Sequence, residues 1–252
     1  MDEGWTRLVL EQFSFPYATL MDAELKKGDL NTKYDVIVFP EDSTATITGD
    51  RPAAAGAAAP AAGGRGGRGG GGGEGGGGGR GGAMPPEFRT GIGAEGVTAL
   101  RTFVERGGTI VTLGSASQFA MDRLGVSVRN VVAGKNSKEF WSPGSTLKIK
   151  LDNTNPLAYG MPADALAVYF DSNPAFEVTA PQDADKYTVV ARYADRDLLE
   201  SGWLLGEENL TKRAAVVSAR IGEGRVVLIG FRTQHRAQTH GTYKLLFNTL
   251  VR

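Results

Sequence analysis

Cysteine is absent from the 252 residues of the chain. Its absence excludes disulfide bonds, thiolate metal sites and a cysteine nucleophile. Histidine is nearly absent as well, because only His235 and His240 occur. Any catalytic or metal-binding role for imidazole therefore depends on these two residues.

Net charge and long apolar runs are also lacking. The 28 basic and 28 acidic residues cancel, so the totals give no electrostatic reason to expect nucleic acid or an anionic membrane as a partner. No apolar run approaches the roughly 20 residues that span a bilayer. The first seven residues have no basic region followed by an apolar core, so no signal peptide is predicted. Localisation is left open.

The pattern of apolar residues predicts an α/β domain. Residues 34–39 and 109–113 are typical of buried strands, and the spacing of apolar residues predicts a helix at 94–106 between them. A right-handed crossover makes these two strands parallel. The remaining expected elements are strands at 17–20, 145–152, 166–170, 176–178 and 188–193, a hairpin of 214–219 with 225–231, a helix at 117–124 and a helix ending at Leu250.

A helix is expected almost from the first residue. Trp5, Leu8, Val9 and Phe13 recur with helical spacing, and Asp2 can cap the helix N-terminus. A doubly wound domain normally has a strand before its first helix. We therefore expect residues 1–252 to form a single domain that lacks its first strand.

Glycine and alanine dominate residues 49–83. The part from 63 to 82 holds 16 glycines, three arginines and one glutamate. Such a segment cannot bury enough apolar surface to offset its ordering entropy, which predicts a disordered insert within the domain. Arg-Gly-Gly occurs at Arg65, Arg68 and Arg80, a pattern that can bind RNA, but the absence of Phe and Tyr favours a neutral spacer.

The polar loop 232–240 contains both histidines, and it joins a buried strand to the last helix. Open α/β sheets bind ligands beyond the carboxyl ends of their strands, which is where this loop lies. Arg232, His235, Arg236 and His240 could hold a small anion or a sugar. The alternative is that polar side chains only tie the loop down through hydrogen bonds to backbone carbonyls. The two histidines are five residues apart and no third exists, so no zinc site is predicted.

Ser115 is the candidate nucleophile. It follows the strand 109–113 and precedes a helix, which is the position of a nucleophile elbow, the sharp strand-to-helix turn that carries the reactive side chain of many hydrolases. The stretch is not G-x-S-x-G, because Ser117 occupies the position of the second glycine. Ser115 would need His235 or His240 as its base. Alternatively, Ser115 or Ser117 caps the helix that follows.

Several short motifs, in order along the chain, resemble one known family. They are MDEGWTR at 1–7, YDVIV at 34–38, MPPE at 84–87, GIG at 91–93, PLAYGMP at 156–162, SGWLLG at 201–206 and GFRTQHRAQTHG at 230–241. Together they resemble the C-terminal glutamine-amidotransferase-like domain of some bacterial zinc carboxypeptidase-like proteins of the carboxypeptidase A type. The resemblance covers nearly the whole chain except the glycine-rich insert.

The resemblance implies a flavodoxin-like, class I glutamine-amidotransferase-like three-layer sandwich with added antiparallel strands. It also implies a preceding peptidase domain as partner, which would hold the only zinc, in a parent protein that resembles exported peptidases. This chain has no His-x-x-Glu motif and no cysteine at the elbow. We therefore expect a non-catalytic accessory domain for binding or interdomain packing, without peptidase or glutaminase activity. The alternatives are a stand-alone serine hydrolase and a small-ligand module at the loop 232–240.

Overall fold

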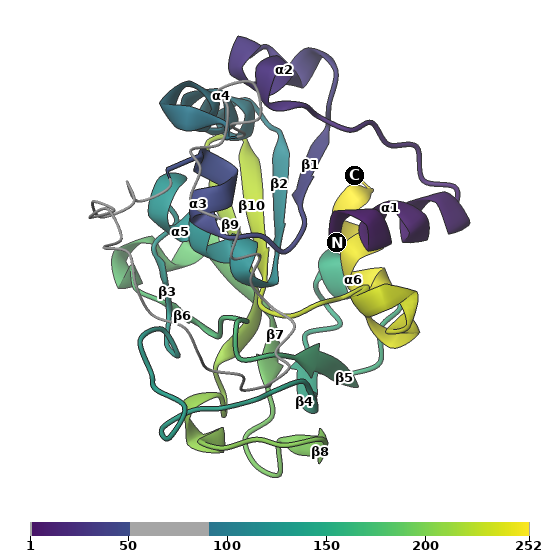
Figure 1. The fold of residues 1–252 in the computed structure, drawn as a ribbon, viewed down its shortest axis with the longest axis vertical. Helices are drawn as coiled ribbons and strands as arrows, with labels where there is room; N and C mark the ends of the chain where they lie inside the picture. The colour runs from purple at the N-terminus through teal and green to yellow at the C-terminus, as the bar shows by residue number, and fades with distance from the viewer. Residues whose placement is uncertain (1, 51–90, 252) are drawn as a thin grey trace, which may run out of the picture.

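The computed structural model describes residues 2–50 and 91–251 (Figure 1). The expected insert at 49–83 lies outside these residues except for Gly49 and Asp50. Gly49 has a left-handed backbone (φ 80°) and ends a short helix, α3 (Thr44–Thr48). None of the helices in the described part of the chain is long and apolar enough to cross a membrane.

Six α-helices and ten strands are described. The other helices are α1 (Asp2–Gln12), α2 (Asp22–Lys27), α4 (Gly93–Glu105), α5 (Ser117–Arg123) and α6 (Tyr243–Leu250). The strands are β1 (Val36–Phe39), β2 (Thr109–Leu113), β3 (Val128–Asn130), β4 (Ser145–Leu151), β5 (Asp164–Tyr169), β6 (Phe176–Val178), β7 (Tyr187–Tyr193), β8 (Leu199–Ser201), β9 (Ala214–Ile221) and β10 (Gly224–Ile229).

The strands form one mixed sheet in the order β1-β2-β10-β9-β7-β4-β5, with β3, β6 and β8 paired off this path. β1, β2 and β10 are parallel, with Ile110 of β2 in register with Ile37 and Val226. β9 pairs antiparallel with β10 and with β7, and β4 pairs antiparallel with β7 and β5. The prediction of an α/β fold with added antiparallel strands is confirmed. The strand expected at 17–20 is wrong, because these residues belong to no helix or strand.

The parallel part of the sheet differs from a flavodoxin-like sheet in one respect. In the flavodoxin-like order 2-1-3-4-5, a first strand preceding α1 would lie between β1 and β2. These two strands instead pair directly with each other over four residues. The described strands therefore do not reproduce the flavodoxin-like order.

Successive side chains of a strand point to opposite faces of the sheet, and in β2 and β10 the residues on both faces are buried, apart from Arg225. On β2, Ile110 belongs to one apolar core and Val111 to another. The first core includes Leu100 and Phe103 of α4 together with Phe119 of α5. The second core includes Leu245 and Leu246 of α6. Figure 1 shows α4 and α5 on one side of these strands and α6 on the other. Burial on both faces explains the continuous apolar runs of β2 and β10.

The N-terminal helix differs in detail from the expectation. The buried residues of α1 are Thr6, Val9 and Leu10, whereas Phe13 is 52% exposed. Asp2 is the first residue of the helix, and its Oδ2 is buried without a hydrogen-bond partner among the described residues. The expected apolar face is therefore shifted by about one position, and the side chain of Asp2 is directed into the protein instead of serving as a solvent-facing cap.

Replacement of Leu228, which is fully buried on β10, tests the position of the core. Leu228→Ala should lower the free energy of unfolding by about 2–5 kcal/mol, because it removes packed methyl groups and leaves a cavity. Leu166→Ala is the matched control, since Leu166 is 46% exposed on β5, and it should change stability by only about 0.5 kcal/mol. Urea denaturation measures both changes, and equal losses would contradict the assigned core.

Candidate functional site

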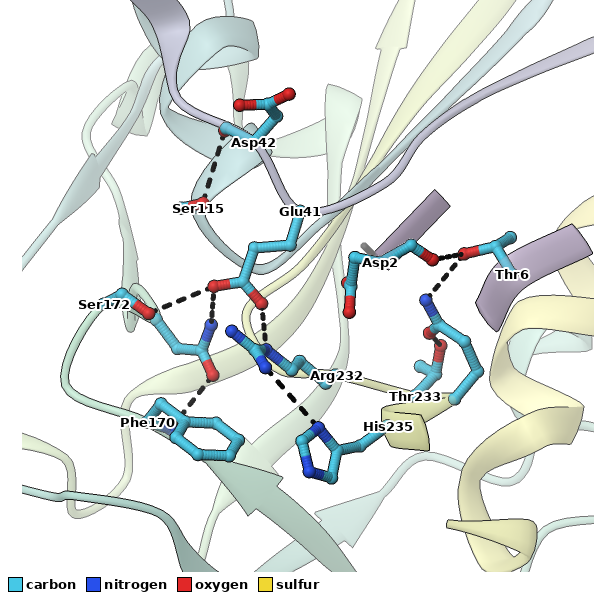
Figure 2. Close-up of polar contacts among 12 residues, drawn as sticks. Asp2, Thr6, Glu41, Asp42, Ser115, Phe170, Ser172, Arg232, Thr233 and His235 are labelled. Atoms are coloured by element: carbon cyan, nitrogen blue, oxygen red, sulfur yellow. Dashed lines mark hydrogen bonds and ion pairs between the residues drawn. The ribbon is translucent and has the colours of Figure 1, made fainter. Parts of the chain in front are cut away.

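The candidate site is centred on Glu41, which follows β1 at its carboxyl end. The Glu41 side chain is only 6% exposed. Its Oε1 accepts hydrogen bonds from Ser172 Oγ at 3.0 Å and from Asn173 Nδ2 at 3.2 Å. Its Oε2 accepts a hydrogen bond from Arg232 Nε, which completes an ion pair (Figure 2). Three donors from two other loops thus hold one buried carboxylate.

Arg232 lies three residues beyond the end of β10. Its guanidinium carbon is 4.4 Å from the centre of the Phe170 ring, a cation–π distance. Its Nη1 lies 3.5 Å from His235 Nδ1, and the His235 ring lies 5.1 Å from that of Phe170. Burial acts to lower the pKa of Arg232, but the hydrogen bond and charge of Glu41, with the charge of Asp2, raise this pKa above its ordinary value. Arg232 is therefore a fixed cation whose charge Glu41 already compensates.

The Glu41 carboxylate lies directly against the turn that follows β2. Gly114 adopts a left-handed backbone (φ 53°) at the start of this turn. A Cβ atom built on Gly114 would lie 2.7 Å from Asn173 Nδ2 and 2.9 Å from the carboxylate carbon of Glu41. No side chain fits there, so glycine is required for both conformation and space. The carboxylate thus fills the space in front of the elbow position.

Asp2 adds a second carboxylate to the cluster. Burial is the largest cause that raises the pKa of Asp2, and the charge of Glu41 adds to it. The charge of Arg232 and the backbone of Glu41 oppose this rise. Two carboxyl groups, those of Asp2 and Glu41, thus face the single guanidinium of Arg232. This balance disfavours an additional anion.

The structure brings together two of the four residues predicted to bind a ligand. Arg232 and His235 belong to the cluster with Glu41. Arg236 is exposed, with a left-handed backbone (φ 49°). His240 is also exposed, and its ring stacks on Tyr243 at 5.1 Å. Arg236 and His240 are therefore not among the side chains that contact Glu41 and Phe170.

Ser115 has a different partner from the one that a serine hydrolase requires. Its Oγ donates to the backbone oxygen of Asp42 at 3.2 Å. No hydrogen bond joins Ser115 to either histidine, both of which lie in the described part of the chain. In Figure 2, Glu41 and Arg232 lie between Ser115 and His235.

The alternative role for the serines, as helix caps, is wrong. Helix α5 has no side-chain hydrogen bond at its N-terminus. It follows directly from a 3₁₀ turn of residues 114–116, so no extended residue precedes it as a cap. Ser117 is instead fully buried, and its Oγ lies 3.0 Å from Thr112 Oγ1.

Hydrogen bonds within the protein fix the loop 232–240. Thr233 O accepts hydrogen bonds from Thr239 Oγ1 at 2.7 Å and from Thr242 Oγ1 at 2.8 Å. The buried Gln234 donates through Nε2 to Thr6 Oγ1 of α1 at 2.8 Å. Side-chain hydrogen bonds to a backbone carbonyl thus hold the loop, as the alternative to ligand binding predicts. The donors are threonines rather than arginine and histidine.

Among the described residues, the cluster is neither a metal site nor part of the large surface hollow. Within residues 2–50 and 91–251, no group of three or more His, Asp or Glu side chains could hold a metal ion. A hollow of about 660 Å³ lies elsewhere, between β4, β5 and the loop 194–197. Lys148, Lys150, Asp164 and Asp195 are among its lining residues. None of the cluster residues lines this hollow.

Sequence reasoning missed Glu41, Asp2 and Phe170 as members of the site. Glu41 carries a recognisable signal, because it comes two residues after a buried strand, at the edge where parallel strands of an α/β sheet present their ligands. Phe170 and Asp2 carry no such signal. Their approach to Arg232 depends on long-range packing between segments far apart in the sequence.

Comparison with known proteins shows a shared fold but no family. No protein-family model and no curated protein matches the sequence. Among solved structures, the chain is similar to the cytoplasmic protein STM3548 from Salmonella typhimurium, with a TM-score of 0.52 and 12% identity over 98% of this chain and 84% of that chain. At this identity the likeness shows a shared fold alone.

Two further structures are more distant. One is a putative ThuA-like protein from Bacteroides uniformis, with a TM-score of 0.37 and 12% identity over 62% of each chain. The other is a β-galactosidase from Bacillus circulans, with a TM-score of 0.39 and 12% identity over 62% of this chain and 21% of that chain. Both TM-scores are too low to support an inference about this chain.

Removing the charge of Glu41 should destabilise the protein. Glu41→Gln leaves the guanidinium of Arg232 partly buried without its counter-ion. We expect a loss of about 2–3 kcal/mol in the free energy of unfolding, below the roughly 3–5 kcal/mol typical of a fully buried pair, because Arg232 is 25% exposed. The control Glu200→Gln breaks an exposed pair with Lys148 and should cost at most about 1 kcal/mol. Chemical denaturation compares the two, and equal small losses would refute the structural role of Glu41.

His235 should make stability depend on pH. Burial, followed by the charges of Arg232 and Arg236, lowers the pKa of His235 in the folded state. Its contribution to stability is therefore fully present above the unfolded pKa of about 6.5 and is lost as the pH falls through the lower folded pKa. The difference in unfolding free energy between the wild type and His235→Asn should shrink over that range, as measured by denaturation at several pH values.

The matched control for this experiment is His240→Asn on the same loop. It leaves His235 and its neighbours in place, so this variant should keep the contribution of His235. A wild type and His235→Asn that differ by a constant amount between about pH 5 and pH 8, the range in which an imidazole titrates, would contradict the assigned environment.

Proposed function

We propose that this chain is a non-catalytic accessory domain, with a class I amidotransferase-like α/β fold whose elbow position is closed from within by Glu41. The observation that carries the proposal is the contact between the Glu41 carboxylate and Gly114, together with the hydrogen bond from Ser115 to the backbone of Asp42. The domain serves in binding or interdomain packing rather than in peptidase or glutaminase chemistry.

The chemistry at the elbow supports this proposal. A serine becomes a nucleophile when a base within hydrogen-bond reach takes its proton. The backbone carbonyl of Asp42 accepts the hydrogen bond of Ser115 but cannot act as that base. Acyl transfer also needs donors where negative charge develops on an oxygen. A buried carboxylate in front of the elbow has the opposite effect, because it repels the developing charge.

The finer description of the fold is supported by two features. Helices cover both faces of the parallel strands, as a three-layer flavodoxin-like sandwich requires. The succession β2, glycine turn and α5 also has the order of strand, elbow and helix found in such domains. Direct pairing of β1 with β2 makes this domain a variant of that architecture.

The partner follows from the motifs that resemble zinc carboxypeptidase-like proteins. In this proposal a peptidase domain is the partner, and zinc belongs to that domain. The alternative of an anion-binding module is disfavoured, because an anion that bound Arg232 would first have to displace Glu41 from its guanidinium.

Activity measurements on the purified chain test the proposal. We expect no labelling of Ser115 by a fluorophosphonate probe and no hydrolysis of p-nitrophenyl acetate above the rate of a Ser115→Ala variant. We also expect no release of ammonia from glutamine and no zinc-dependent cleavage of carboxypeptidase substrates. Probe labelling or ester hydrolysis that disappears in Ser115→Ala would establish a serine hydrolase instead and overturn the proposal.

A further inference from the structure

Two tryptophan rings lie together on the surface near β8, away from the Glu41 cluster. Trp203 is 63% exposed and Trp141 is 37% exposed, with ring centres 6.2 Å apart in an edge-to-face arrangement. Leu205 (42% exposed) pairs with Trp141 in an antiparallel β-bridge, and Leu199 (36% exposed) lies on β8, four residues before Trp203. Figure 1 shows β8 at the end of the molecule opposite α2. We call Trp141, Trp203, Leu199 and Leu205 the tryptophan patch.

The backbone holds the patch in a defined geometry. Trp141 and Leu205 exchange two backbone hydrogen bonds of 3.1 and 2.9 Å. The backbone N–H of Trp203 donates to Ser145 Oγ at 3.0 Å, and Ser145 Oγ donates in turn to Trp203 O. Gly202 has a left-handed backbone (φ 100°), and a Cβ atom there would lie 2.9 Å from Ser145 Oγ. Both indoles are therefore carried on a short, cross-linked ribbon rather than on a loose loop.

The patch offers the exposed indole face of Trp203, with the Trp141 ring set at 62° to it. Neither indole N–H has a hydrogen-bond partner in the described part of the chain. Stacking uses the apolar ring faces, and the indole N–H groups can donate to a polar ligand at the ring edges. A ligand that fits both features has one apolar C–H face and hydroxyl oxygens around its rim.

Charge and area narrow the class of ligand further. No excess of positive charge borders the patch in the sequence, because Lys138 and Glu139 precede Trp141 and Glu207 and Glu208 follow Leu205. Lys148 of β4 pairs with Glu200 of β8 at 3.3 Å. A single-stranded nucleic acid would need a basic groove beside the aromatic rings. A stable protein partner would need roughly 800 Å² on this side, whereas the exposed parts of two indoles and two leucines supply about half of that at the areas typical of such side chains.

We propose that the tryptophan patch binds a neutral saccharide chain, with the apolar face of a β-linked pyranose ring stacked on Trp203. Equatorial hydroxyls leave the axial C–H groups of such a ring on its two faces, where they can contact the indole. Trp141 borders the stacked ring, and the indole N–H groups donate to sugar oxygens. The patch does not include the Glu41 cluster, so the proposal is independent of whether the elbow is catalytic.

Affinity gel electrophoresis of the full chain tests the proposal. The probes are soluble β-glucan, xylan, galactomannan and glycol chitin in the gel, with cellohexaose and chitohexaose as free competitors. We expect at least one polysaccharide to retard the wild type and its oligosaccharide to reverse the effect. Trp203→Ala should weaken this retardation at least tenfold. Tyr159→Ala is the matched control, because Tyr159 is 77% exposed but lies outside the patch, and it should migrate like the wild type.

Each other outcome overturns the proposal. If no probe retards the wild type, a saccharide ligand is excluded. Equal retardation of the wild type and Trp203→Ala would exclude the patch as the binding site. Sedimentation of the same variants adds a separate readout. A wild-type dimer that Trp203→Ala converts to a monomer would identify the patch as a protein interface instead. Thermal unfolding verifies that Trp203→Ala is folded, and Trp203→Phe, which keeps a ring face, should retain part of the binding.

Discussion

The ion pair of Glu41 with Arg232 is the constraint on which the rest of this structure depends. It joins the carboxyl end of β1 to the loop after β10, and Ser172 and Asn173 connect the same carboxylate to the loop between β5 and β6. The parallel and antiparallel parts of the sheet are therefore linked by one buried side chain. Because three donors satisfy Glu41, burial of its charge is compensated rather than destabilising.

The same ion pair explains why the carboxyl edge of the parallel strands, where such sheets bind ligands, does not bring Ser115 and a histidine together. Open α/β sheets place ligands where β1, β2 and β10 end, and here a carboxylate from the protein itself fills that position against Gly114. His235 approaches Arg232 rather than Ser115. Aromatic surface in contact with solvent lies away from this position, and it includes the two adjoining indoles near β8.

Local patterns in the sequence predict most of the fold. Continuous apolar runs locate β1, β2 and β10, alternation locates β4, and the glycines at 222 and 224 locate the turn between β9 and β10, because each signal arises from burial or backbone conformation within a few residues. The face of α1 is misplaced because Thr6 is buried in order to bond Gln234, 228 residues away. Spacing of apolar residues cannot reveal such a contact.

The candidate site is predictable only in part for the same reason. Arg232 and His235 belong to one loop and are recognised together, whereas Glu41, Phe170 and Asp2 come from three other segments. These residues come together only through the order of the strands in the sheet. The charge balance of the site follows from Glu41 and Asp2, so the sequence alone favours an anion where the assembled cluster opposes one.

A double-mutant cycle on Glu41 and Arg232 tests the central claim most directly. The free energies of unfolding of the wild type, Glu41→Ala, Arg232→Ala and the double variant give the coupling between the two side chains. We predict a favourable coupling of at least about 1.5 kcal/mol, because removing either side chain leaves the other partly buried and unpaired. Additive losses, with a coupling below about 0.5 kcal/mol, would contradict the claim that this ion pair holds the fold together.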